Sequence, residues 1–263
     1  MITVWSQGVA DKNMPEVVLI DALDKVRRHP WSRARAKLAL ATLEKHGVHA
    51  PASVADVGCG WGTNLDALEE AGYQTVGFDI SRHILELIDH PHRCLVETDL
   101  NQALPRDHAM FDALLALDVI EHLDDDRGAV MRMASLLQPE GIAIISVPAL
   151  PELFSEFDEI QGHRRRYLPE TLRAAFRDTG LTVREIFWWG AWMVPVFRCT
   201  RRRRSSKPNE QPKPAKAYVD YLQLPPWPVP AMMNWMYAFE QRRALKGLLR
   251  IGTSLFAVAV RKS

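Results

Sequence analysis

The stretch VADVGCGWGTN at residues 54–64 constrains the fold of this chain more than any other. Three glycines, Gly58, Gly60 and Gly62, alternate directly after a short apolar run. Glycine adopts positive φ readily, and without a Cβ its backbone can approach a ligand closely. The pattern therefore predicts a buried strand over Ser53–Val57, a tight turn, and a helix that begins at Gly62 with free N–H groups facing a ligand.

Short apolar runs alternate with helical patterns through the rest of the chain. The continuous apolar run ALLAL at Ala113–Leu117 needs cover on both faces, as strands of a parallel sheet with helices on each side have. The expected strands are Ser53–Val57, Thr75–Phe78, Cys94–Val96, Ala113–Leu117, Ile142–Val147, Leu181–Trp188 and Ser254–Val260. The expected helices are Trp31–Lys45, Gly62–Ala71, Arg82–Asp89, Arg127–Leu137, Pro169–Thr179 and Pro230–Lys246, with a turn at Pro139–Gly141. This alternation predicts an α/β fold with a doubly wound sheet.

Composition narrows the cellular setting. The formal net charge of +1 argues against a whole-molecule basic field built for nucleic acid. Three widely spaced cysteines without a C-x-x-C pair suggest a reducing compartment. No signal peptide is visible, and the longest apolar stretch, Ile186–Phe197, is too short to span a bilayer and contains Pro195. A cytoplasmic location is therefore expected.

The glycine turn alone suits a phosphate, a pyrophosphate or a carboxylate. A nucleotide P-loop would carry a lysine after the loop, where Thr63 and Asn64 stand. The third glycine of a dinucleotide fingerprint would fall at Thr63, so this spacing departs from that motif as well.

Acidic residues end three neighbouring expected strands, namely Asp79, Asp99 and Asp118. The carboxyl ends of parallel strands line the crevice where such sheets bind ligands. Carboxylates there would repel a pyrophosphate and favour a ligand with a ribose, an amine, an ammonium and a sulfonium, which describes S-adenosylmethionine. The alternative interpretation is that the three acids are helix caps or turn residues.

Five motifs resemble, in order, those of class I S-adenosylmethionine-dependent methyltransferases: DVGCGWG, GFDIS, ETDL, FDALLALDVIEHL and LQPEGIAIISVP. The resemblance covers about Ala52–Trp188 and is strongest to the small-molecule branch that includes ubiquinone-biosynthesis O-methyltransferases. It implies a Rossmann-like sheet of seven strands whose last strand, Ser254–Val260, is antiparallel.

The same resemblance implies which residues bind S-adenosylmethionine and release S-adenosylhomocysteine. Gly58, Gly60 and Gly62 would contact the methionine part, with Asp118 beside its ammonium. Asp79 and Ile80 would hold the ribose and flank the adenine. Asp99 would accept from the adenine amine, with Leu100 packed nearby. One arginine of the Trp31–Arg35 segment would pair with the methionine carboxylate.

Two histidines, His122 and His163, are candidates for a general base if the acceptor is a hydroxyl. For His122, a structural hydrogen bond is the stronger alternative. Glu121 beside His122 hints at a metal, but no further ligand stands at metal spacing, so no metal site is expected. The run Arg164–Arg166 would bind an acidic substrate group or face solvent.

The C-terminal third departs from the alternating pattern. We expect a helical cover over 1–50, a cofactor-binding core over 51–190, a helical lid over 191–253 with a flexible basic loop at Arg201–Pro214, and a final strand within 254–263. The aromatic and arginine-rich segment 186–204 predicts an apolar acceptor tunnel, a contact with anionic membrane, or a lid packed on the sheet.

The sequence thus predicts an enzyme that methylates a small, hydrophobic metabolite, with oxygen the favoured acceptor atom. A nicotinamide-dependent oxidoreductase and a non-catalytic S-adenosylmethionine-binding partner module are the alternatives. Nucleic acid is not an expected partner.

Overall fold

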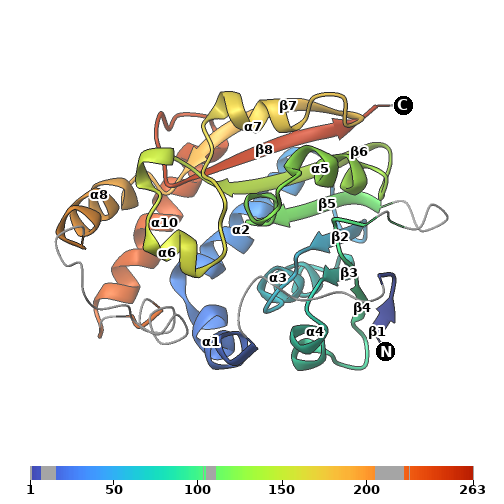
Figure 1. Ribbon diagram of the computed structural model, residues 1–263, viewed down its shortest axis with the longest axis horizontal. Helices are drawn as coiled ribbons and strands as arrows, with labels where there is room; N and C mark the ends of the chain where they lie inside the picture. The colour runs from blue at the N-terminus through green and yellow to red at the C-terminus, as the bar shows by residue number, and fades with distance from the viewer. Residues whose placement is uncertain are drawn as a thin grey trace.

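The computed structural model describes residues 2–6, 16–102, 104, 111–204, 222–224 and 226–262. They form one eight-stranded sheet covered by helices on both faces, with strand order β1-β4-β3-β2-β5-β6-β8-β7 (Figure 1). The strands are β1 (Ile2–Val4), β2 (Ser53–Val57), β3 (Gln74–Asp79), β4 (Cys94–Glu97), β5 (Phe111–Leu117), β6 (Leu137–Pro148), β7 (Leu181–Trp189) and β8 (Ser254–Arg261). The doubly wound α/β class is confirmed.

The strand count differs from the predicted seven because β1 adds an eighth at the sheet edge. It pairs in parallel with β4, with Ile2 opposite Leu95 and Val4 opposite Glu97. Three residues carry too little alternation to stand out in the sequence, and their burial depends on a partner strand far along the chain. The antiparallel last strand is confirmed, since β8 lies between β6 and β7 and runs antiparallel to both.

The expected helices are present, and each begins within one residue of its expected start. They are α1 (Glu16–Arg28), α2 (Pro30–Lys45), α3 (Thr63–Glu70), α4 (Arg82–Ile88), α5 (Asp126–Ala134), α6 (Glu156–Ile160), α7 (Pro169–Ala175), α8 (Met193–Arg204) and α10 (Val229–Leu245), with short 3-10 turns η1 (Ile120–His122) and η2 (Pro151–Leu153). The expected turn at Pro139–Gly141 does not interrupt the strand, because β6 passes through it with Glu140 at φ 65°.

Strand β5 shows why helices must cover both faces of the sheet. Leu114 and Ala116 pack in the core on the side of α5 and α7, whereas Ala113, Leu115 and Leu117 pack on the side of α2 and α10. Successive side chains of a strand point to opposite faces, so a run without polar residues is buried on both.

Helices α8 and α10 are inserted between β7 and β8 and lie together at one end of the molecule (Figure 1). The expected loop at Arg201–Pro214 is wrong at its start, because α8 continues through Arg204. Arginine is a good helix former, so four of them extend a helix as readily as they end one. The rest of that expected loop, beyond residue 204, lies outside the described residues. Within those residues, every helix is too short or too polar to cross a bilayer.

Candidate functional site

A cavity of about 1210 Å³ opens at the carboxyl ends of β2, β3, β4 and β5 and extends to α8 and α10. Seven of the eight predicted cofactor residues line it, namely Gly58, Gly60, Asp79, Ile80, Asp99, Leu100 and Asp118. Both candidate bases, His122 and His163, line it too. The fold therefore brings nearly all the predicted site residues, from the loops after four strands and from the distant segment of His163, around one cavity.

The glycine turn has the conformation that its sequence predicts. Gly58, Gly60 and Gly62 have φ of 70°, 47° and 74°, all in the left-handed region. A Cβ on Gly58 would lie 2.5 Å from Cγ2 of Val119, whereas one on Gly60 would meet no atom closer than 3.9 Å. Gly58 is thus required by packing, and Gly60 exposes its backbone to the cavity.

Gly62 differs from its predicted role. It is the N-cap of α3 and does not line the cavity. Its missing Cβ would point at Arg93, 3.1 Å from Nη1, and at Ile88. Its left-handed conformation turns the chain into the helix, so its glycine serves the turn and not a direct contact with the cavity.

Asp79 and Asp99 line the cavity and also fix the loops that carry them. Asp79 accepts hydrogen bonds from the backbone N–H of Gly60 at 2.8 Å and of Ser81 at 2.9 Å. Asp99 accepts from the backbone N–H of Asn101 at 2.8 Å. The turn interpretation and the binding interpretation are therefore compatible, because each carboxylate closes a turn on the cavity wall.

Asp118 directly follows β5 and has φ 60°, an unusual conformation for a residue with a side chain. Its carboxylate forms an ion pair with Arg35 of α2 and accepts from Ser146 Oγ at 3.2 Å. The Arg35 guanidinium lies 4.4 Å from the ring centroid of Trp31. A positive and a negative group therefore stand side by side on the cavity wall.

The two histidines pack edge to face with ring centroids 4.8 Å apart. Burial, followed by the nearby His163, lowers the pKa of His122 to about 4, so His122 is neutral at physiological pH. His163 Nδ1 lies 3.1 Å from Oδ1 of Asp158, which also accepts from Arg166 Nε at 2.7 Å. This contact is best satisfied when His163 carries its proton on Nδ1.

Asp158 is a site residue that the sequence reasoning missed. It is fully buried, and although burial alone would raise its pKa, the hydrogen bond from His163 and the charge of Arg166 lower that pKa to about 2. The Asp158 carboxylate is therefore ionised at physiological pH and holds the His163 ring in place. Its place five residues before His163, in FDEIQGH, was the available signal, but only the turn after α6 brings the two side chains together.

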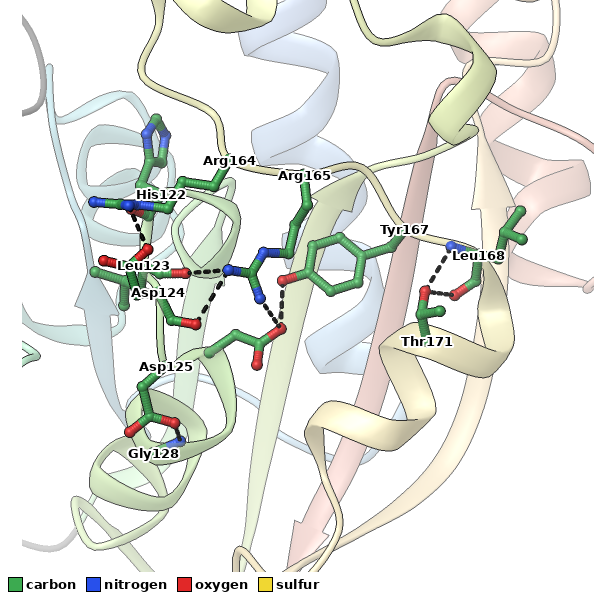
Figure 2. Close-up of polar contacts among 11 residues, drawn as sticks. His122, Leu123, Asp124, Asp125, Gly128, Arg164, Arg165, Tyr167, Leu168 and Thr171 are labelled. Carbon is green, nitrogen blue, oxygen red and sulfur yellow. Dashed lines mark hydrogen bonds and ion pairs between the residues drawn. The ribbon is translucent and has the colours of Figure 1, made fainter.

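The run Arg164–Arg166 also has a structural role: Arg164 is exposed to solvent and Arg166 lines the cavity, as the two expected alternatives allow, but all three side chains bind neighbouring segments. Figure 2 shows Arg164 and Arg165 reaching the loop after β5, where Arg164 Nε donates to the carbonyl of His122 at 2.7 Å and Arg165 Nη2 to that of Leu123 at 3.1 Å. The Tyr167 hydroxyl donates to Asp126 at 2.8 Å. Together these contacts tie the His163 segment to the His122 segment.

A buried acid lies beside the histidines. Glu121 is fully buried, and neither carboxylate oxygen has a hydrogen-bond partner among the described residues. Oε1 lies 3.9 Å from His163 Nε2, and burial, followed by the charge of Asp118, raises the pKa of Glu121.

Ligand atoms of Glu121, His122 and His163 lie within 4.8 Å of one another, so these residues could hold a metal ion. The expectation of no metal rested on a missing further ligand, and the fold supplies His163 as that ligand.

The far end of the cavity is apolar. Its wall comes from α8 and α10, with side chains of Met193, Val196, Phe197, Met232, Met233 and Tyr237. The aromatic residues of the preceding strand serve the core instead, since Phe187 and Trp189 are buried. Phe187 and Trp189 pack between β7 and the helices of one face and therefore take no part in the predicted membrane contact of segment 186–204. For the rest of that segment the membrane contact stays a prediction.

The chain matches known proteins over part of its length, and the matched family model ends before α8. A family model described as a methyltransferase domain matches residues 23–186. Over 118 residues the chain is 27% identical to a ubiquinone biosynthesis O-methyltransferase of Chromobacterium violaceum, which covers 41% of this chain and 50% of the relative. The enzyme of the same name from Bradyrhizobium diazoefficiens is 32% identical over 102 residues, or 35% of this chain and 38% of the relative. The chain thus spans half or less of the length of these curated relatives.

Solved structures share the fold at low identity. The [4+2]-cyclase SpnF aligns with a TM-score of 0.59 and 15% identity over 98% of this chain and 99% of its own. An S-adenosylmethionine-dependent methyltransferase from Archaeoglobus fulgidus aligns with a TM-score of 0.50 and 18% identity over 86% of this chain and 94% of its own. At these identities the likeness shows the fold, and the chemistry must be argued from the site.

Proposed function

Because the chain belongs to the methyltransferase domain family, we propose that it binds S-adenosylmethionine and methylates a small apolar acceptor, at oxygen. One observation supports this most. A single cavity joins the glycine turn and its acids to an oriented histidine and then to an apolar end.

The residues at the sheet edge fit this cofactor. Gly60 leaves the turn open to the cavity, and Asp79 and Asp99 offer carboxylates suited to ribose hydroxyls and an adenine amine. The Arg35–Asp118 pair offers opposite charges, which match the carboxylate and ammonium of an amino acid end. When bound, the cofactor supplies an electrophilic methyl group on a sulfonium. The chain supplies orientation and the exclusion of water.

His163 is the proposed general base. With its proton on Nδ1, facing Asp158, its Nε2 is free to accept a proton from an acceptor hydroxyl. Asp158 stays ionised and stabilises the imidazolium that results, and Arg166 keeps Asp158 from turning away. The nearby His122 is neutral, so it adds no positive charge that would disfavour the imidazolium form of His163.

Apolar side chains of α8 and α10 at the far end favour a hydrophobic acceptor. Two buried donors there lack partners among the residues described, namely Trp192 Nε1 and the Tyr237 hydroxyl. An unpaired buried donor is costly, so an acceptor that carries an oxygen near them gains affinity by satisfying it.

Calorimetric titration with S-adenosylhomocysteine and, separately, NADH tests the cofactor. Binding of the first and not the second is expected, and the reverse would establish the oxidoreductase alternative. Incubation with methyl-labelled S-adenosylmethionine and cell metabolite fractions then tests the transfer. Cofactor binding without label transfer to any fraction would favour the partner module, and label in a water-soluble polar fraction would refute the apolar acceptor.

A further inference from the structure

Helix α10 has a face that the described residues leave exposed. We define the α10 face as Met232, Trp235, Phe239, Arg242, Arg243 and Lys246. At about 100° per residue these positions fall within an arc of roughly 100°, and Met233, Tyr237, Glu240 and Ala244, which are buried or half-buried, lie on the other side. We propose that the α10 face docks on an anionic lipid bilayer. This goes beyond the proposed methyl transfer and does not depend on it.

The first half of the α10 face is apolar and exposed. Met232, Trp235 and Phe239 are 51%, 67% and 58% exposed, and the rings of Trp235 and Phe239 stack with centroids 6.0 Å apart. Trp227, just before the helix, is 82% exposed. Single exposed apolar residues are ordinary, but four large ones on or just before a single helix mark an interaction site. Tryptophan and phenylalanine are suited to the interface between lipid headgroups and acyl chains.

The second half of the α10 face identifies the kind of partner. Arg242, Arg243 and Lys246 are all exposed there, and Arg243 lies 5.8 Å from the ring centroid of Phe239. Glu240, the single acid of the 229–245 helix, is buried and accepts from the backbone N–H of Ala191 at 2.5 Å. The exposed face is therefore wholly cationic beside its aromatic residues. Such a face attracts anionic headgroups and repels the same face of a second copy of this chain.

The α10 face adjoins the mouth of the cavity. Met232 belongs to both, since it lines the cavity and is exposed. Phe154 and Val196, from the loop after β6 and from α8, also line the cavity and are 37% and 44% exposed. These three apolar side chains share the exposed rim with Glu156, Thr200 and Gln223. A bilayer at this face would let an apolar molecule enter the cavity without crossing water.

Sedimentation with vesicles tests the docking. We expect the protein to bind vesicles of phosphatidylcholine with about 30% phosphatidylglycerol at least tenfold more tightly than pure phosphatidylcholine, and high salt to release it. Trp235→Gln with Phe239→Gln, and separately Arg242→Gln with Arg243→Gln, should each reduce the bound fraction at least tenfold. These four side chains do not line the cavity, so S-adenosylhomocysteine affinity should stay unchanged and report that the variants fold.

Matched controls lie on other surfaces of the molecule. Met131→Gln removes a side chain that is 51% exposed on α5, and Arg177→Gln with Arg184→Gln removes two exposed charges near β7. These should leave vesicle binding unchanged. Equal binding to neutral vesicles, no binding to any vesicle, or equal losses in controls and test variants would each overturn the proposal. A dimer in sedimentation equilibrium that Trp235→Gln with Phe239→Gln abolishes would assign the face to a second copy instead.

Discussion

The two ends of the cavity are built in different ways. At the cofactor end, the acids Asp79 and Asp99 accept from nearby backbone N–H groups, as Asp79 does from Gly60 and Ser81. Single buried atoms of Arg35, Asp56 and Asn64 have no partner there among the described residues. At the acceptor end, buried polar atoms have no partner in the described part of the chain, among them both oxygens of Glu121, His122 Nδ1 and the Tyr237 hydroxyl. Buried polar groups are normally paired, so the difference lies in the acids: Asp79 and Asp99 are fixed by the backbone, whereas both oxygens of Glu121 are left for a ligand to satisfy.

Of the variants proposed for the cofactor end, Gly58→Ala should lower stability most. The left-handed conformation costs a residue with a side chain about 1–2 kcal/mol, and the contact with Val119 adds about 1–3 kcal/mol. Urea denaturation should therefore show a loss of about 3 kcal/mol in unfolding free energy and weakened S-adenosylhomocysteine binding. Gly47→Ala is the matched control, since Gly47 has φ 82° with no atom near a Cβ. Equal losses in the two variants would show that packing at Val119 contributes nothing.

At the acceptor end, His163→Gln should lower kcat about 100-fold with S-adenosylhomocysteine affinity unchanged, because a general base contributes about 10²–10⁴ in rate. Asp158→Asn should give a smaller loss and shift the acid limb of the pH–rate profile, since it removes the anion that faces His163 Nδ1. His49→Gln, an exposed histidine after α2, is the control. An unchanged kcat in His163→Gln would mean that positioning alone supports the reaction.

Asp79→Ala should weaken S-adenosylhomocysteine binding at least tenfold by calorimetry, because charge-assisted hydrogen bonds contribute about 1.5–3 kcal/mol. The same variant frees the N–H groups of Gly60 and Ser81, so its stability should fall as well. Asp24→Ala, an exposed acid of α1, should change neither quantity. If Asp79→Ala lost stability yet kept its affinity, the residue would hold the turn only.

The smallest effect concerns His122 and pH. Its folded pKa is about 4 and its unfolded pKa about 6.5, so only the unfolded state takes up a proton as the pH falls through this range. As the pH falls from 6.5 to 5, His122 therefore lowers the unfolding free energy by about 1.5 kcal/mol. Glu121, with its raised pKa, acts in the opposite direction. The His122 contribution is the difference between the denaturation profiles of the wild type and His122→Asn, and superimposable profiles would contradict the burial of this ring.

Sequence predicted the cofactor end better than the acceptor end for a physical reason. The strand at Ser53–Val57 matched at both ends, since its apolar run and the glycines after it are local signals. The pairing of His163 with Asp158, the helical arginines of α8 and the exposure of Trp235 depend on what packs where in three dimensions. Apolar residues on α10 predict a helix, but the pattern does not reveal which of its faces the core covers.

The position of β8 has a consequence for how this molecule can vary. Trp189 at the end of β7 and Ser254 at the start of β8 lie opposite each other on adjacent strands. The 64 residues between them are therefore an insertion whose two ends meet at one point of the sheet. This insertion contains both α8 and α10, and hence most of the apolar wall of the cavity. Exchanging it for a segment of different length would leave every strand pairing intact. The apolar end of the cavity can therefore diverge in this architecture while the glycine turn and its acids stay as they are.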